Sequence, residues 1–136
     1  MSQEYNQNYY PPFPQLSVIL DSGDERLGPF LALLDTGADV TFVPTKLLEK
    51  VGAIESVQAK IRSHFGEVQP VQLYLTGIHV EGINLVGLYV VGDDEGDEII
   101  LGRDVLNKLP LFLDGLEMQT DLLTEIEVQR LRRQRK

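Results

Sequence analysis

The apolar residues of this chain come in many short runs, and this pattern restricts the fold more than any other feature. The runs at 16–20, 40–43 and 83–91 are rich in β-branched residues or alternate with polar ones, as strands do. Gly, Pro and acidic clusters separate the runs. Only two short helices are expected, near 45–51 and 103–109, and no strand–helix–strand rhythm is visible. The sequence therefore predicts an all-β fold.

Three hairpins are predicted where strand-like runs flank turn residues. The first spans 16–34, the second has Phe65 and Gly66 at its tip, and the third spans 111–122. The length of 136 residues fits one domain with one modest core. We divide the chain into an extended or disordered arm, a folded domain and a basic tail, at 1–14, 15–123 and 124–136.

Charge and composition exclude several classes of function. The net charge of −9 argues against nucleic acid and anionic membranes as partners. Without Cys there is no disulfide, no thiolate zinc site and no cysteine nucleophile. Two histidines, His64 and His79, cannot form a three-histidine metal site. The acidic stretch 93–98 lacks the spaced ligands of an EF-hand calcium loop, so we expect no metal and no cofactor.

Neither the apolar runs nor the first residues indicate a membrane or secretory segment. No run approaches the roughly 20 residues that span a bilayer, and residues 1–10 lack the pattern of a signal peptide. The chain is expected to be soluble and cytoplasmic. Residues 130–136 carry five basic residues, which leaves seven basic against twenty-one acidic residues, a net charge of −14, at 1–129. We expect a solvated, partly helical tail, or alternatively a tail that binds an acidic surface.

Two segments carry the chemistry. In the first segment, a carboxylate lies between two strand-like runs. Its sequence is Leu33-Leu34-Asp35-Thr36-Gly37-Ala38-Asp39, followed by Val40-Thr41-Phe42-Val43-Pro44. Asp-Thr-Gly alone is a weak signal, because Asp often caps its own turn. The second segment is Ile99-Ile-Leu-Gly-Arg-Asp-Val-Leu106, where a short helix is expected to begin. In this order, and with a β-rich interior between them, the two segments resemble those of retropepsin-like (retroviral-type) aspartic peptidases. The resemblance extends over about 16–122.

A second tripeptide of the same type, Asp21-Ser22-Gly23, is interpreted differently. Charged residues follow it instead of Ala and an apolar strand. We expect it to form the exposed tip of the first hairpin, with an ordinary pKa for Asp21. The two tripeptides lie only fourteen residues apart. They therefore cannot be the paired motifs of a two-lobed, pepsin-like chain.

One usable motif per chain implies a homodimer. Aspartic peptidases need two close carboxylates that share one proton, because two like charges at that distance do not both ionise. Two chains related by a two-fold axis would bring Asp35 to its own copy. The resemblance implies the same symmetric dimer, with a retropepsin-like barrel, a polypeptide substrate and an aspartic endopeptidase activity.

The resemblance also assigns roles to single residues. It implies that Thr36 bonds the partner chain's Thr36 backbone, and that Gly37 presents its carbonyl to the substrate. It implies that Asp39 contacts the substrate backbone and pairs with Arg103. Gly37 is also expected to let the backbone turn sharply. Structural support is expected from four further residues, Ala38, Gly102, Arg103 and Asp104.

The hairpin at 63–67 would be the flap that covers the substrate, with Phe65 and Gly66 in contact with it. Its tip is bulkier than the Gly- and Ile-rich tips of the viral enzymes. His64 is expected to be solvated, or alternatively to confer pH sensitivity. His79 is expected to face the solvent from a strand.

Other functions and arrangements stay open at this point. The bulky flap favours, as the main alternative, a dimeric protein-interaction module that keeps the fold and hydrolyses little. An unrelated β-barrel with a chance Asp-Thr-Gly does not account for the segment 102–104. The hairpin at 111–122 is a candidate for the dimer interface, and the two terminal segments are candidates for self-cleavage.

Overall fold

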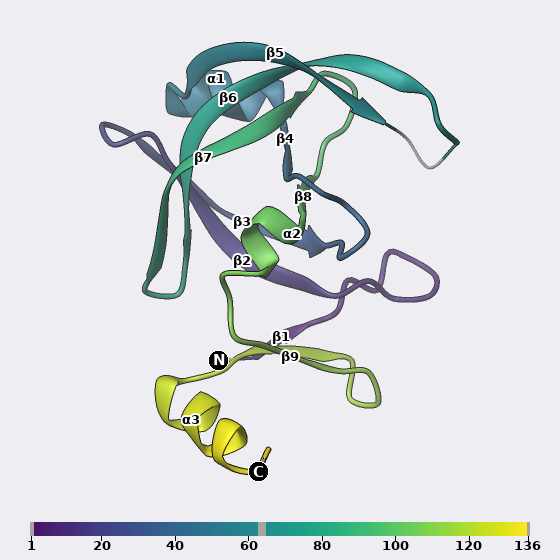
Figure 1. Ribbon diagram of the computed structural model, residues 1–136, viewed down its shortest axis with the longest axis vertical. Helices are drawn as coiled ribbons and strands as arrows, with labels where there is room; N and C mark the ends of the chain where they lie inside the picture. Colours follow the sequence, from purple (N-terminus) through teal and green to yellow (C-terminus); the bar gives the residue numbers. More distant parts are fainter. Residues whose placement is uncertain (1, 63–64, 136) are drawn as a thin grey trace.

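The computed structural model describes residues 2–62 and 65–135, which contain ten strands and three short helices (Figure 1). The strands are β1 (Ser2–Glu4), β2 (Gln15–Asp21), β3 (Arg26–Leu34), β4 (Phe42–Pro44), β5 (Ile54–Arg62), β6 (Val68–Val80), β7 (Ile83–Asp93), β8 (Ile99–Leu101), β9 (Leu111–Asp114) and β10 (Gln119–Leu122). The helices are α1 (Thr45–Val51), α2 (Arg103–Leu106) and α3 (Glu125–Arg133). The all-β prediction is confirmed, and so are the three hairpins.

The larger sheet closes into a barrel. Its seven strands follow the order β2-β3-β8-β4-β7-β6-β5, and β2 also pairs with β6 through Leu20 and Ile78. The ring therefore consists of six strands, and β5 extends it only through its pairing with β6. In Figure 1 the β5–β6 hairpin projects away from the ring at the upper right. Ser63 and His64, expected in the flap, lie outside the described residues.

Apolar side chains from the ring strands, α1 and α2 form one core. Leu20, Leu48, Ile78 and Leu101 are completely buried, and each contributes roughly 1.5–3 kcal/mol to folding by leaving water. Gly52 ends α1 with a left-handed backbone (φ 75°), and its amide bonds the carbonyl of Glu49. This core fixes the barrel strands on which the two motif segments are carried.

A parallel strand pair brings the two motif segments together. β3 and β8 pair in parallel, with Leu34 opposite Leu101. Because both strands run in the same direction, the residues after each one leave the sheet at the same edge. The amide of Asp35 accordingly donates to the carbonyl of Leu101 at 2.9 Å. Asp35 and Leu101, far apart in the sequence, thus become neighbours through backbone pairing.

A second, three-stranded sheet has the order β1-β10-β9. Of the two descriptions offered for residues 1–14, extended or disordered, the structure shows an extended start, since Ser2 of β1 pairs with Asp121 of β10. The remainder of this segment forms a loop that is held by backbone bonds between Asn6 and Phe13. The sequence prediction missed this strand because its partner lies at the opposite end of the chain.

The tail forms α3, which begins with a capping box. The Thr124 hydroxyl accepts from the Glu127 amide, and the Glu127 carboxylate accepts from the Thr124 amide. No residue of α3 is buried. Among the described residues, no helix is both long and apolar enough to cross a membrane.

Candidate active site

Asp35 lies at the start of a loop, residues 35–41, that leaves the barrel edge after β3. Its side chain is half-buried, and its Oδ1 accepts a 2.9 Å hydrogen bond from the amide of Gly37. The amide of Ala38 donates to the Asp35 carbonyl at 3.1 Å and closes a tight turn. The strand before Asp35 and this turn after it fix the direction of the carboxylate.

Gly37 has no left-handed backbone, but a side chain at this position would make a tight contact. Its φ is not positive, which corrects the expectation that it allows a sharp turn through glycine's conformational freedom. A Cβ at this position would lie 3.1 Å from Asp35 Oδ1. The side chain of any other residue would therefore crowd the carboxylate oxygen that the Gly37 amide holds.

Arg103 binds the 35–41 loop from α2. Its Nη1 donates to the carbonyl of Thr36 at 2.6 Å, and its Nη2 forms an ion pair with Asp39. Its own amide donates to the carbonyl of Ala38 at 2.8 Å. The predicted pairing of Asp39 with Arg103 is confirmed. Three contacts from one residue hold both ends of the turn that follows Asp35.

A buried hydrogen-bond network lies beneath this clamp. The completely buried Thr41 donates through its hydroxyl to Asp104 Oδ1 at 2.8 Å, and its amide donates to Asp104 Oδ2 at 3.2 Å. The same hydroxyl accepts from the amide of Gly102 at 3.1 Å. Sequence reasoning missed Thr41, which stands in an apolar run without a periodic signal. Its position opposite the Gly-Arg-Asp triplet becomes evident only in three dimensions.

Gly102 allows the two segments to approach closely. A Cβ there would lie 2.4 Å from the carbonyl oxygen of Val40 and 2.9 Å from that of Ala38. Both neighbours are backbone atoms, which cannot rotate away as a side chain would. Gly102 is therefore needed for close packing of the loop on α2.

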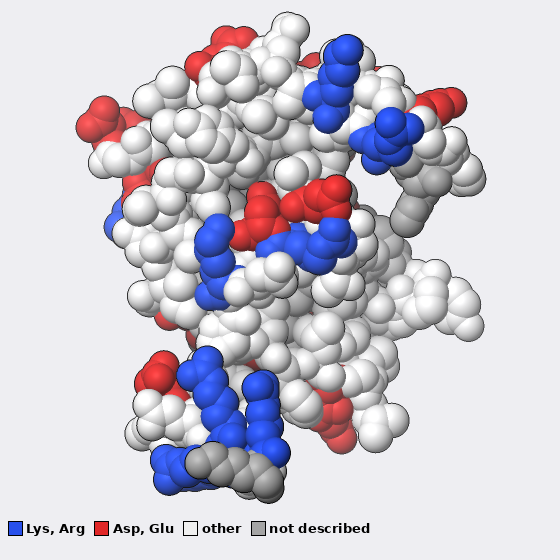
Figure 2. Space-filling model, viewed as in Figure 1, with Lys and Arg blue, Asp and Glu red and all other residues white. Residues whose placement is uncertain are grey.

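A pocket of about 590 Å³ opens beside the 35–41 loop. Loop residues 37–40 and Phe42 line one side, and residues 60–62 of β5 line the other. On the face shown in Figure 2, basic side chains lie over the β5–β6 hairpin and the surface is hollowed beneath them. Phe65 is 95% exposed at the hairpin tip, and Gly66 (φ 82°) accepts from Arg62 through its carbonyl at 3.2 Å.

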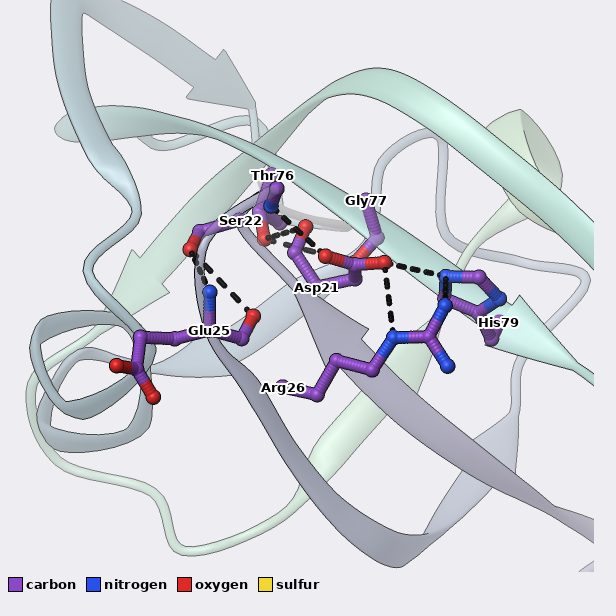
Figure 3. Close-up of polar contacts among 8 residues, drawn as sticks. Asp21, Ser22, Glu25, Arg26, Thr76, Gly77 and His79 are labelled. Atoms are coloured by element: carbon purple, nitrogen blue, oxygen red, sulfur yellow. Dashed lines mark hydrogen bonds and ion pairs between the residues drawn. The ribbon is translucent and has the colours of Figure 1, made fainter.

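The second tripeptide, Asp21-Ser22-Gly23, forms the turn between β2 and β3, as predicted (Figure 3). The environment of Asp21 was predicted wrongly. Bonds from the Gly23 amide, at 2.7 Å, and from His79 hold the pKa of Asp21 below its ordinary value. His79 was expected to face the solvent, but its side chain is only 15% exposed and its Nε2 lies 2.5 Å from Asp21 Oδ2. These contacts join β2 to β6 and belong to the barrel closure.

The acidic stretch 93–98 forms a loop in which several carboxylates have protein partners. Asp93 accepts from the amides of Glu95 and Gly96, and Asp94 accepts from the Thr45 hydroxyl. Within residues 2–62 and 65–135, no group of three or more His, Asp or Glu side chains is arranged to hold a metal ion.

Comparison with known proteins agrees with this geometry. Residues 27–108 match the family model described as gag-polyprotein putative aspartyl protease. None of the curated proteins matches the chain significantly. An EIAV protease bound to an inhibitor is similar over 78% of this chain and 93% of its own, at 22% identity and a TM-score of 0.52. A retropepsin-like aspartic protease from Rickettsia conorii is similar over 90% and 88%, at 12% identity and a TM-score of 0.59.

These identities show a common fold. The family match covers both the Asp35 loop and the Gly102–Asp104 segment, the two parts of the site that the parallel strands bring together. The chain therefore belongs to the retropepsin-like family of aspartyl proteases.

Proposed function

We propose that the protein is an aspartic endopeptidase whose catalytic pair consists of Asp35 from each of two identical chains. One observation carries the proposal. The two other carboxylates of the motif segments already have side-chain partners, Asp39 with Arg103 and Asp104 with Thr41, whereas the Asp35 carboxylate has only the Gly37 amide as a partner among the described residues, and Gly37 itself lines the pocket. Asp35 is thus the carboxylate that is available for chemistry, and the second one has to come from another chain.

The reaction follows from two carboxyl groups that share a proton. The ionised group takes a proton from a water molecule between them, while the protonated group donates its proton to the carbonyl oxygen of the substrate peptide bond. The water oxygen bonds to the carbonyl carbon and gives a tetrahedral diol. When the carbon–nitrogen bond breaks, the carboxyl group that took the water proton passes it to the leaving nitrogen. The other carboxylate takes a proton from a diol hydroxyl as the new carbonyl forms, which restores the starting pair. No covalent enzyme intermediate is formed.

Positioning of Asp35 depends on the clamp from α2. Arg103 holds the carbonyl of Thr36 and the carboxylate of Asp39, and the Thr41–Asp104 network supports the same loop from below. A carboxyl pair shares a proton only at short distance, so small displacements of the loop would be costly. Arg103, Thr41 and Asp104 act as positioning residues in this proposal.

The β9–β10 hairpin is the surface on which we place the dimer contact. Phe112 and Leu113 of β9 are 50% and 44% exposed, and Leu116 in the turn is 97% exposed. One edge of β9 pairs with β10, and its other edge has no strand partner among the described residues. Exposed apolar side chains on an unpaired strand edge favour association with another chain.

The substrate in this proposal is an extended polypeptide that lies between the 35–41 loop and the β5–β6 hairpin. Its main chain would meet Gly37 and Asp39, and Phe65 and Gly66 would contact it from above. Phe65 is almost fully exposed, as expected of a side chain whose partner is a substrate. Main-chain bonds of this kind recognise a strand-like segment, and neighbouring pockets add side-chain preference.

The test compares wild type with Asp35→Asn on an unstructured protein substrate between pH 4 and 7. Asp21→Asn is the matched control, since it changes the other Asp-x-Gly tripeptide. We expect Asp35→Asn alone to abolish cleavage while secondary structure and dimer mass are retained. Unchanged cleavage by Asp35→Asn contradicts the proposal. Absence of cleavage from a dimeric wild type favours the interaction module instead.

Mixing wild-type and Asp35→Asn chains tests directly whether each active site contains one Asp35 from each chain. If each active site takes one Asp35 from each chain, an excess of Asp35→Asn chains draws wild-type chains into inactive mixed dimers. Cleavage per wild-type chain should then fall as mutant is added. A constant rate per wild-type chain would show that one Asp35 is sufficient.

A further inference from the structure

The pocket beside the 35–41 loop has a distinct charge pattern. Its lower wall is largely apolar, with Ala38, Val40 and Phe42. Its upper wall is formed by β5, with Ile61 between the two cations Lys60 and Arg62. β5 is the edge strand of the barrel sheet, so residues from both of its faces border the pocket. An apolar wall opposite two cations suits a side chain with a short apolar stem and an anionic end.

The cations of this pocket are available to a ligand. Lys60 and Arg62 are both exposed, and neither forms an ion pair within residues 2–62 and 65–135. Arg62 uses its Nη1 for the Gly66 carbonyl, which leaves its other guanidinium N–H groups for further bonds. By contrast, three other basic side chains of the described residues form ion pairs with carboxylates of the chain itself: Arg26, Lys46 and Arg103.

The single carboxylate in the pocket does not cancel this charge. Asp39 lines the pocket, but it is already neutralised by its ion pair with Arg103. Two cations therefore face one paired carboxylate. The site is cationic in a chain whose net charge is −9. At about 0.1 M salt, charges beyond about 10 Å are largely screened, so the local cations decide the preference of the pocket.

The adjoining pocket carries acidic instead of basic side chains, which limits the preference for an anionic substrate side chain to one pocket. It shares Phe42 and Ile61 with the first pocket, but its far side carries Asp93, Asp94 and Glu95. An anionic substrate side chain would be repelled there. Discrimination is therefore expected at one position of the substrate rather than along its whole length.

We infer that this pocket selects substrates with a carboxylate side chain, Asp or Glu, at the position that lies between Lys60 and Phe42. The inference rests on the proposed function and adds to it the substrate class. The bonds formed would be charge-assisted, from the Lys60 ammonium and the Arg62 guanidinium to the carboxylate. Since both cations are exposed, each is expected to contribute about a two- to fivefold difference in affinity.

Binding to the Asp35→Asn chain separates recognition from cleavage. The probes are eight-residue apolar peptides that carry one Glu, Gln or Lys at each position in turn. We expect the Glu peptide to bind about four- to twentyfold more tightly than its Gln counterpart at one position, and the difference to decrease with added salt. In the Lys60→Glu/Arg62→Glu double variant, the preference at this position should reverse toward Lys. The control double variant, Lys46→Glu/Lys50→Glu, has the same charge change on α1 and should keep the Glu preference.

Several results overturn the inference. These are equal affinities for Glu, Gln and Lys at every position, a Glu preference that survives the Lys60/Arg62 change, an equal loss in the α1 control, or no binding of any peptide. Wild-type cleavage of the same peptides provides the second readout. Glu-selective binding without cleavage would overturn the proposed function and leave only the carboxylate selectivity of the pocket. Cleavage that does not depend on the position of Glu would support the proposed function and overturn the inference.

Discussion

The buried hydroxyl of Thr41 donates a 2.8 Å hydrogen bond to the carboxylate of Asp104. This bond connects the loop that carries Asp35 to the helix that carries Arg103. The hydroxyl also accepts from the Gly102 amide, so one side chain satisfies groups on both motif segments. The Asp35 loop and α2 therefore behave as one unit. The residue that joins them, Thr41, lies outside both 35–37 and 102–104.

Replacement of Thr41 by Val keeps the shape and removes the hydroxyl. The Gly102 amide and one Asp104 oxygen would lose a buried partner, which should destabilise the fold by about 1–3 kcal/mol. Urea unfolding measures the change. Thr120→Val is the matched control, because the hydroxyl of Thr120 is buried with no hydrogen-bond partner among the described residues. Equal effects of the two substitutions would contradict the network.

Gly102→Ala tests the close approach of the two segments. The added Cβ would lie 2.4 Å from the Val40 carbonyl oxygen, and backbone movement to relieve this should cost about 1–3 kcal/mol. Gly115→Ala, where nothing lies within 4 Å of the added carbon, should change the free energy of unfolding little. If Gly102→Ala were as stable as Gly115→Ala, the loop would not need glycine for space.

Arg103→Lys tests the clamp on the Asp35 loop. Lysine has no planar fork to reach the Thr36 carbonyl and the Asp39 carboxylate together, so the loop should lose one of the two contacts that the Arg103 side chain makes. We expect kcat for peptide cleavage to fall about ten- to a hundredfold with a smaller change in KM. Arg26→Lys makes the same substitution in an ion pair of the barrel closure and should leave kcat unchanged. A loss confined to KM would assign Arg103 to substrate binding instead.

Asp21 should make the stability of the fold depend on pH. Its carboxyl pKa is lowered by the Gly23 amide and by His79, so the charged form is favoured in the folded state. The resulting stabilisation is fully present above the ordinary pKa of Asp and is lost as the pH falls through the lowered value. Asp21→Asn should therefore unfold at lower urea concentration at pH 7, and its difference from wild type should shrink toward pH 3. Asp24→Asn in the same turn is the control, and a difference independent of pH would contradict the assignment.

Features that are encoded locally could be predicted from the sequence. The hairpin around 21–26 follows from a turn cluster between two apolar runs, and its strands β2 and β3 lie within two residues of the predicted ones. Gly52 was a detectable helix end because helices often end in a residue with a left-handed backbone, which glycine adopts easily. The pairing of Asp39 with Arg103 followed from the family resemblance, which contains the three-dimensional information that spacing lacks.

Features that depend on contacts distant in the sequence could not be predicted in this way. β1 has few apolar residues, and its pairing with β10 is evident only when both strands are in place. His79 lies in an alternating strand, where period-two reasoning placed it on the solvent side, but the β2–β6 pairing that closes the barrel brings Asp21 over it. Thr41 is similar, since its partners Gly102 and Asp104 lie at the start of α2, which directly follows β8. In each case the missing information was a strand pairing.

The pairing of β1 with β10 also has a consequence for synthesis. Ser2 and Asp121 are separated by 119 residues, so β1 leaves the ribosome well before its partner β10. At about 5–20 residues per second, that interval is roughly 6–24 s. The barrel, whose strands lie between the two, has time to form first. The small sheet with its exposed apolar hairpin is thus completed after the barrel strands are available, which delays the surface proposed for dimerisation until the barrel that bears it can be folded.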